Sequence, residues 1–257
     1  MRTKPYLNRT LEQNLREVKV ALRTGMQLEN IKIFLLKETI GEQSDGVSVI
    51  QDGAQSQGPK DPLTLALEIG QLLQKNNIDY AVGGSLAFGI WAVPRATTDV
   101  DMNVYTETSD QQGISDLLDT LELAGVEFRN SHMGKLISRE EAECVVAGHH
   151  QIYFRLCGRD VDIFLPKLAM DNSSKQRRKE VSVDGKPLFF LDAETIAVYK
   201  LLWKRDKDII DLEQLFAVRG SQLDLEYMKT VLDLMCLDEL DNTYNLFYKL
   251  QRDYIKK

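Results

Sequence analysis

The chain has 257 residues, of which 43% are hydrophobic and 28% are charged, and its net charge is −7. This composition excludes wholesale disorder, and the negative charge disfavours broad, non-specific binding to nucleic acid. No apolar run reaches the roughly 18 residues that span a bilayer, and the first residues lack the apolar stretch of a secretory signal. The three cysteines are far apart and fit neither a disulfide framework nor a zinc site, so we expect a cytoplasmic protein without a membrane partner.

The N-terminal segment differs in charge from the rest of the chain. Residues 1–40 carry eight Lys or Arg against four Asp or Glu, and apolar side chains recur there at helical spacing. We expect a helical appendage that packs on the main body, on a second copy or on a partner protein, with contact to RNA as the alternative. Residues 41–60 contain four glycines together with several Ser and Gln, which predicts a linker. The main body is therefore expected to begin near residue 61.

A helix, a short strand and a glycine turn open the main body. An amphipathic pattern predicts a helix over residues 63–75, and residues 78–82 are an apolar strand candidate. Gly83, Gly84 and Ser85 follow that strand and precede a second helical stretch. Glycines let the backbone approach a ligand, and a helix N-terminus presents free N–H groups to phosphate. A tight turn without a ligand explains the same residues, so the turn alone does not establish a phosphate site.

The next element carries two carboxylates on one face. Residues 98–105 alternate polar and apolar side chains, which is typical of a strand with one buried face. Asp99 and Asp101 then lie side by side, and their mutual repulsion favours a bound cation such as Mg²⁺. A solvated acidic strand face is the alternative. The glycine turn about fourteen residues earlier and Arg95, four residues before Asp99, favour a site.

A third carboxylate follows in a predicted hairpin. Residues 152–156 and 161–165 are strand candidates joined by a turn at Gly158. Asp162 lies within the second apolar run, where a carboxylate is costly unless it is paired or binds a metal. Asp160 would share its strand face, so the sequence leaves the choice between the two open. We favour Asp162 because it lies deeper in the apolar run.

These motifs together resemble the polymerase-beta-like nucleotidyltransferases, most closely their minimal branch of bacterial abortive-infection-type toxins. The resemblance covers roughly residues 63–220 and includes a later block: Leu191-Asp192-Ala193-Glu194, Lys200-Leu201-Leu202 and Arg205 to Leu212. It implies an α/β (α+β) fold, with a mixed sheet in a catalytic core over residues 61–190 and a helical region over residues 191–257.

The resemblance also implies residue roles. The three carboxylates Asp99, Asp101 and Asp162 would be catalytic and hold Mg²⁺ or Mn²⁺ in a two-metal site. The remaining predicted site residues would bind the phosphates of a nucleoside triphosphate such as ATP: Gly83, Gly84, Ser85, Arg95 and Lys200.

Two expectations concern the helices of the later block. Asp192 is expected to cap the helix that carries Lys200. By contrast, Lys207, Asp208 and Asp211 are expected to be structural, because Lys207 and Asp211 have the i, i+4 spacing of a helix-surface ion pair.

The implied activity is transfer of a nucleoside monophosphate to a hydroxyl group with release of pyrophosphate. The sequence leaves the acceptor open among a tRNA end, a protein side chain and a small molecule, and a toxin role rests on analogy alone. A catalytically silent nucleotide-binding or interaction protein of the same fold is the alternative, although the presence of all three carboxylates disfavours it. An antitoxin-like protein that acts through residues 1–40 is a third hypothesis.

Overall fold

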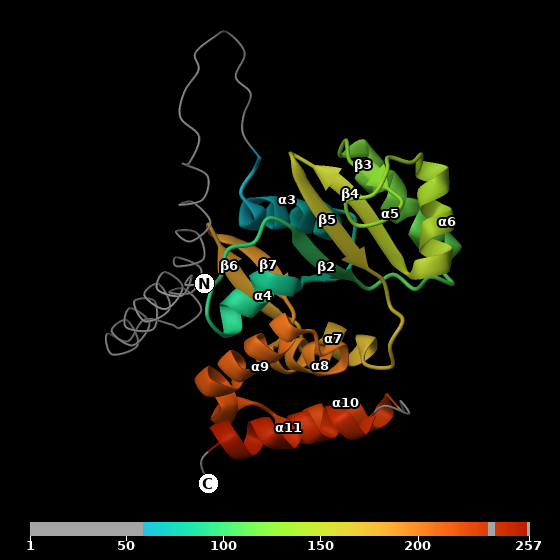
Figure 1. Ribbon diagram of the computed structural model, residues 1–257. Coiled ribbons are helices and arrows are strands. Elements are labelled where there is room, and N and C mark those ends of the chain that lie inside the picture. Colours follow the sequence, from blue (N-terminus) through green and yellow to red (C-terminus); the bar gives the residue numbers. More distant parts are fainter. Residues whose placement is uncertain (1–58, 236–239, 256–257) are drawn as a thin grey trace, which may run out of the picture.

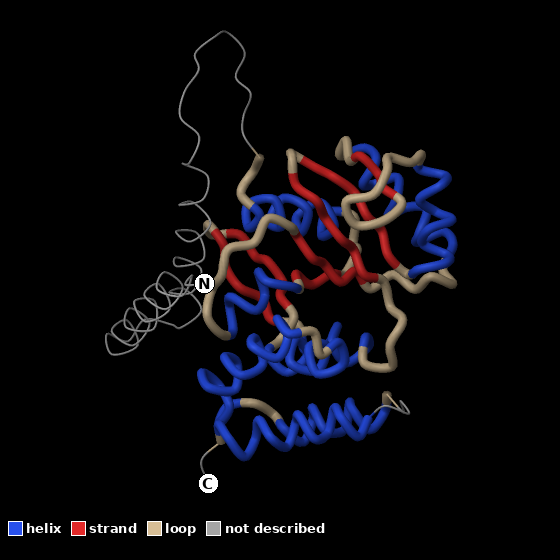
Figure 2. The backbone as a smooth tube through the Cα atoms, viewed as in Figure 1, coloured by secondary structure: helices blue, strands red, loops and turns tan. Residues whose placement is uncertain are grey.

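The computed structural model describes residues 59–235 and 240–255, and Figure 1 shows a central sheet with helices packed around it. The expected helical appendage at residues 1–40 and nearly all of the expected linker lie outside the described residues. In the backbone view of Figure 2, the C-terminal helices gather on one side of the sheet, at the bottom of the view. Within the described residues, no helix is both long and apolar enough to cross a membrane.

The sheet has seven strands in the spatial order β3-β4-β5-β2-β1-β7-β6. β2 is near its centre and pairs antiparallel with β1 and parallel with β5. This mixed sheet confirms the predicted α/β fold. The strands are β1 (Tyr80–Val82), β2 (Val100–Val104), β3 (Glu127–Arg129), β4 (Gln151–Leu156), β5 (Arg159–Phe164), β6 (Lys179–Val183) and β7 (Lys186–Phe190).

Five of the described helices begin with a side-chain cap. Asp61, Asp110, Ser138, Asp192 and Asp224 each accept a hydrogen bond from a backbone N–H of the first turn. The cap predicted at Asp192 is thus confirmed. The helices are α3 (Pro62–Lys75), α4 (Gly84–Trp91), α5 (Gln111–Leu123), α6 (Arg139–His149), α7 (Asp171–Arg177), α8 (Ala193–Trp203), α9 (Asp206–Arg219), α10 (Leu225–Leu234) and α11 (Leu240–Tyr254), with a 3₁₀ turn at Gly220–Gln222.

The predicted elements of the main body are confirmed. In β2 the apolar side chains of Val100, Met102 and Val104 are fully buried, and the polar residues between them are half-buried. The hairpin turn between β4 and β5 consists of Cys157 and Gly158, both with positive φ, as a two-residue hairpin turn requires. Each pattern is local, so the sequence was sufficient to predict it.

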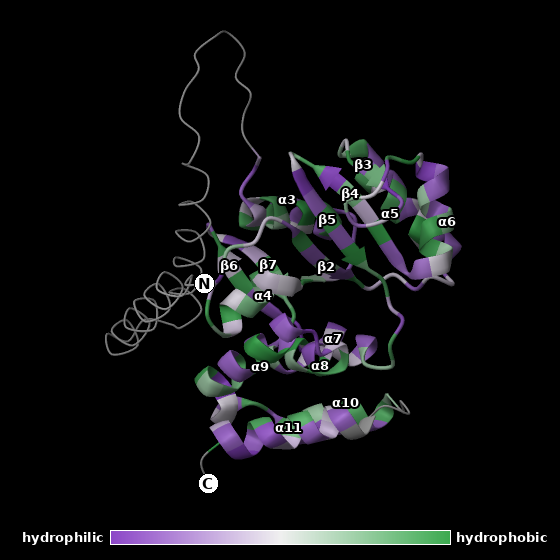
Figure 3. Ribbon diagram, viewed as in Figure 1, coloured by the Kyte–Doolittle hydropathy of each residue, from purple (hydrophilic) through white to green (hydrophobic). Residues whose placement is uncertain are grey.

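The C-terminal helices form the second layer of the core. α8 packs against α4 and α9, and α10 and α11 cover α8 and α9. Figure 3 shows hydrophobic and hydrophilic residues interleaved along α10 and α11, the pattern of helices with one buried face. The buried face includes Met228 and Leu232 on α10 and Phe247 and Leu250 on α11. This packing fixes α8 and α9 beside the strand that carries the acidic pair.

Candidate functional site

The glycine turn lies directly against the acidic strand. The backbone N–H of Gly83 donates to the carbonyl oxygen of Asp101 at 2.8 Å, and Gly84 begins α4 with φ +53°. A Cβ on Gly84 would lie 1.8 Å from Oδ2 of Asp101, so no side chain can be placed there without movement. Ser85 follows in the first turn of α4 and is half-buried. The strand–turn–helix prediction is confirmed, and the turn touches the predicted carboxylate pair.

Three carboxylates lie near the pairing of β2 with β5. Asp101 and Asp162 are direct partners in the parallel register of these strands. Asp99 immediately precedes β2, and its Oδ1 accepts a hydrogen bond from Oγ1 of Thr97 at 2.5 Å. Burial, together with the negative charges of Asp99 and Asp162, raises the pKa of Asp101 to about 7. The carboxylates are therefore close enough to oppose one another's ionisation.

Asp162, rather than Asp160, is the β5 carboxylate level with Asp101. Its Oδ2 lies 2.9 Å from Nδ1 of His132, a residue in the loop between β3 and α6. This hydrogen bond raises the pKa of His132, and burial raises the pKa of Asp162. Asp160 instead has its Oδ1 3.9 Å from Nε of Arg129. Sequence reasoning missed His132, because a lone histidine thirty residues from its partner leaves no local signal.

The donor set fits a divalent cation in its chemistry. Three carboxylates on neighbouring strands supply the oxygen ligands that Mg²⁺ and Mn²⁺ accept. Burial, and to a smaller extent repulsion from Asp99 and Asp162, raises the pKa of Asp101, and a bound cation would offset both effects. Over residues 59–235 and 240–255, no three His, Cys, Asp or Glu side chains lie together in an arrangement that could hold a metal ion as the side chains stand.

A second charged cluster lies between α8 and α9. Nζ of Lys200 donates to Oδ2 of Asp211 at 2.6 Å and to Oδ1 of Asp208 at 3.3 Å, and all three side chains are at most 8% exposed. Arg95 donates to the same Oδ2 of Asp211 at 3.1 Å. The two predicted phosphate-binding cations are thus both engaged by Asp211. The expected surface pair of Lys207 with Asp211 is wrong, since Asp211 turns inward to Lys200.

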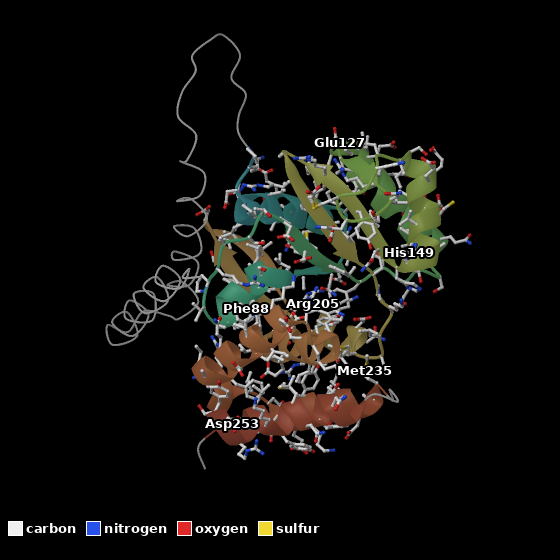
Figure 4. The ribbon with its side chains drawn as sticks, viewed as in Figure 1. Phe88, Glu127, His149, Arg205, Met235 and Asp253 are labelled. Carbon is white, nitrogen blue, oxygen red and sulfur yellow. The ribbon has the colours of Figure 1, made fainter. Side chains whose placement is uncertain are left out.

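Two further cations face the carboxylates from the start of α9. Arg205 donates from Nε to Oδ2 of Asp208 at 2.6 Å, yet 53% of its side chain is exposed. The hydrogen bond to Asp208 raises the pKa of Arg205, with a smaller contribution from the charge of Asp101. The charge of Lys207 opposes the rise in the pKa of Asp101. Figure 4 shows Arg205 near the centre of the view, between the sheet and the C-terminal helices.

The sequence contained these two cations but gave them no distinct signal. Charged residues in the first turn of a helix are most often solvated, whereas here α9 packs on α8 and α4, and α4 packs on β2. A surface cavity of about 640 Å³ lies elsewhere, lined by residues that include Asp79, Tyr105, Asp110 and Lys175. None of the site residues described above lines it.

Comparison with known proteins identifies one family whose model matches the chain and several solved structures. The model of a family described as "Nucleotidyltransferase of unknown function (DUF6036)" matches residues 63–257. No curated protein matches the chain.

Solved structures show low similarity to the chain. One is ANT(2″)-Ia in complex with adenylyl-2″-tobramycin (15% identity, 75% of this chain and 98% of that chain, TM-score 0.40). Another is an antigenic nucleotidyltransferase-like protein from Paracoccidioides brasiliensis (20% identity, 74% and 94%, TM-score 0.39). A third is the lincosamide antibiotic adenylyltransferase LnuA with lincomycin bound (12% identity, 63% and 98%, TM-score 0.39).

Proposed function

The chain belongs to the DUF6036 family of nucleotidyltransferases, and from that premise we propose that it transfers a nucleoside monophosphate from a nucleoside triphosphate to a hydroxyl group. The observation that carries the proposal is the pairing of Asp101 with Asp162 across β2 and β5, beside a turn that only glycine fits. Membership also confirms the predicted superfamily. The acceptor, the bound cation and the roles of individual residues belong to the proposal.

Asp99, Asp101 and Asp162 would hold Mg²⁺ or Mn²⁺, which when bound supplies positive charge to the phosphates and the attacking oxygen. The repulsion within the carboxylate set makes the site ready for that charge. Asp162 is hydrogen-bonded to His132, so His132 and a bound cation would compete for the same carboxylate. His132 is accordingly proposed to hold Asp162 in place when no cation is bound.

The phosphates are proposed to bind where the glycine turn meets Asp101. The first turn of α4, which begins at Gly84, offers backbone N–H groups, and Ser85 adds a hydroxyl donor. Arg205 and Lys207 contribute positive charge from the start of α9. Lys200 acts as a positioning residue, because its two aspartates fix α9 on α8.

In the proposed reaction the acceptor oxygen bonds to the α-phosphorus as the bridging oxygen between the α- and β-phosphorus atoms leaves with pyrophosphate. The hydroxyl proton passes to Asp162, whose pKa burial raises. Such a transfer depends mainly on orientation and charge neutralisation, so few additional groups are needed. The acceptor is a hydroxyl of a tRNA end, a protein side chain or a small molecule, and an essential acceptor would make the protein toxic to its host.

The test uses α-³²P-labelled nucleoside triphosphates with Mg²⁺ and the full chain. Host RNA, host protein and small-molecule fractions are incubated separately, beside an Asp99→Ala/Asp101→Ala variant. We expect label in one fraction and none with the variant, which identifies the acceptor class. Nucleotide binding without label in any fraction, with all three carboxylates intact, would instead support the silent nucleotide-binding protein and overturn the proposed transfer.

A further inference from the structure

Trp203 is an exposed aromatic residue on an otherwise buried helix. It is the last residue of α8 and is 51% exposed, whereas the residues from Ala193 to Leu201 are all buried. Trp91, the second of the two tryptophans in the chain, is buried and donates from Nε1 to the carbonyl oxygen of Leu191 at 2.6 Å. A single exposed apolar residue is ordinary on a protein surface, so a binding role for Trp203 depends on what surrounds it.

The Trp203 ring is held to the strand of the acidic pair through one buried tyrosine. The rings of Tyr199 and Trp203 stack with centroids 5.4 Å apart and an interplanar angle of 15°. The hydroxyl of Tyr199 donates to Oδ1 of Asp171 at 2.8 Å and accepts from Nδ2 of Asn103 at 3.2 Å. Asn103 lies on β2, two residues beyond Asp101. The indole is therefore pre-positioned relative to Asp101, which lowers the entropic cost of binding.

Arg205 connects the indole to the carboxylates. Its guanidinium carbon lies 5.0 Å from the centroid of the Trp203 ring, within the range of a cation–π contact. The same side chain is mostly exposed and lies within electrostatic range of Asp101. A triphosphate bound at the carboxylates would lie within electrostatic range of Arg205, and the indole is the flat surface that Arg205 contacts.

We propose that Trp203 is the stacking surface for the nucleobase of the nucleoside triphosphate, with Arg205 lying between base and phosphates. This inference rests on the proposed function. Stacking uses the π-face that every base has, so the surface would strengthen binding of all four nucleotides without strong base preference. An acceptor RNA base and an aromatic small-molecule acceptor are the other ring-shaped occupants, and the experiment separates them.

The experiment records the fluorescence of Trp203 in the full chain with Mg²⁺. The signal of a Trp203→Phe variant, which keeps Trp91, is subtracted from that of the wild type. The ligands are α,β-methylene-ATP, which resists transfer, tripolyphosphate, which has no base, and, in separate samples, the host RNA and small-molecule fractions. We expect the nucleotide to quench Trp203 and tripolyphosphate to leave it unchanged, although calorimetry shows both to bind.

Affinity provides the second readout. Trp203→Ala should weaken α,β-methylene-ATP about tenfold and leave tripolyphosphate unchanged, in keeping with the contribution of one stacked base. Trp203→Phe should restore most of the affinity, because an aromatic face remains. Ile210→Ala, which removes an exposed apolar side chain of α9, is the matched control and should bind both ligands as the wild type does.

Each contrary result has a distinct meaning. If α,β-methylene-ATP binds without quenching Trp203, and Trp203→Ala binds it as tightly as the wild type does, the stacking inference is wrong and the proposed function stands. If Trp203 responds only when RNA or a small-molecule acceptor is added, the indole serves the acceptor and the inference is again wrong. If neither ligand binds the wild type, the proposed function fails, and the inference fails with it.

Discussion

Two groups of aspartates in this protein have opposite electrostatic surroundings. Asp208 and Asp211 on α9 are buried against Lys200, and Arg205 and Arg95 donate to them as well. By contrast, Asp101 has no ion pair within the described part of the chain and lies beside two further carboxylates. Burial would raise the pKa of Asp208, but the hydrogen bond from Arg205 and the charge of Lys200 hold it below its ordinary value. Burial and like charges raise that of Asp101 to about 7.

The difference separates structure from function among identical side chains. Asp208, Asp211 and Lys200 form a balanced group, in which the charges are paired. This buried group joins α8 to α9 and gains nothing from an added cation. Asp99, Asp101 and Asp162 form an unbalanced group, in which negative charges lie near one another. This group lowers the stability of the fold until a cation binds, which is the arrangement expected of a binding site. The same distinction applies to the basic residues, because Lys200 is enclosed by carboxylates, whereas Arg205 and Lys207 are exposed.

The largest effect is expected within the unbalanced group. Asp162→Asn should reduce nucleotidyl transfer about a thousandfold, because a lost carboxylate removes several kcal/mol of charge stabilisation at the phosphates. Asp160→Asn is the matched control: it lies on the same strand but contacts Arg129, and it should stay within about twofold of the wild type. Steady-state transfer assays of both variants decide the matter, and the reverse pattern would assign the third carboxylate to Asp160.

The unbalanced group could be predicted from sequence because its signals are local. Alternation in residues 98–105 places Asp99 and Asp101 on one face, and a two-residue turn fixes the register of the hairpin that carries Asp162. The parallel pairing of β2 with β5 is not local, and its prediction depends on the mixed sheet that the family resemblance implies.

The balanced group could not be predicted, because it depends on how two helices pack. Lys200 reaches Asp208 and Asp211 across the α8–α9 contact, while helical spacing alone suggested Lys207 as the partner of Asp211. The contact between His132 and Asp162 likewise depends on the path of a loop that no periodicity describes.

The next effect tests the balanced group. Lys200→Met should destabilise the fold by about 3 kcal/mol, since it leaves two buried carboxylates short of their central cation. The value is at the low end for a broken buried pair because Arg95 and Arg205 still donate to these carboxylates. Urea unfolding of Lys200→Met beside Lys207→Met measures it, and equal midpoints for the two variants would show that the cluster does not stabilise the protein.

A smaller effect of opposite sign is expected at Asp101. Its folded pKa is raised from 3.8 to about 7, so the stability this group contributes is present below pH 4 and is lost as the pH rises to 7. Asp101→Asn should therefore stabilise the cation-free protein at pH 8, by at most about 4 kcal/mol from linkage and about 2 kcal/mol after solvent screening.

Thermal unfolding at pH 8 in EDTA and in excess Mg²⁺ checks this expectation. Mg²⁺ should raise the Tm of the wild type and leave that of Asp101→Asn nearly unchanged. A cation-free variant that is less stable than the wild type would mean that the carboxylates do not repel one another.

The smallest effect separates an exposed cation from the buried one. Lys207→Met should raise the KM for the nucleoside triphosphate about fivefold, because an exposed cation near the phosphates is worth about 1 kcal/mol. Its unfolding midpoint should equal that of the wild type, since the described structure gives Lys207 no ion pair to lose. Lys207→Arg keeps the charge and should restore the KM. A Lys207→Met protein with an unchanged KM would leave Arg205 as the sole contribution of α9 to phosphate binding.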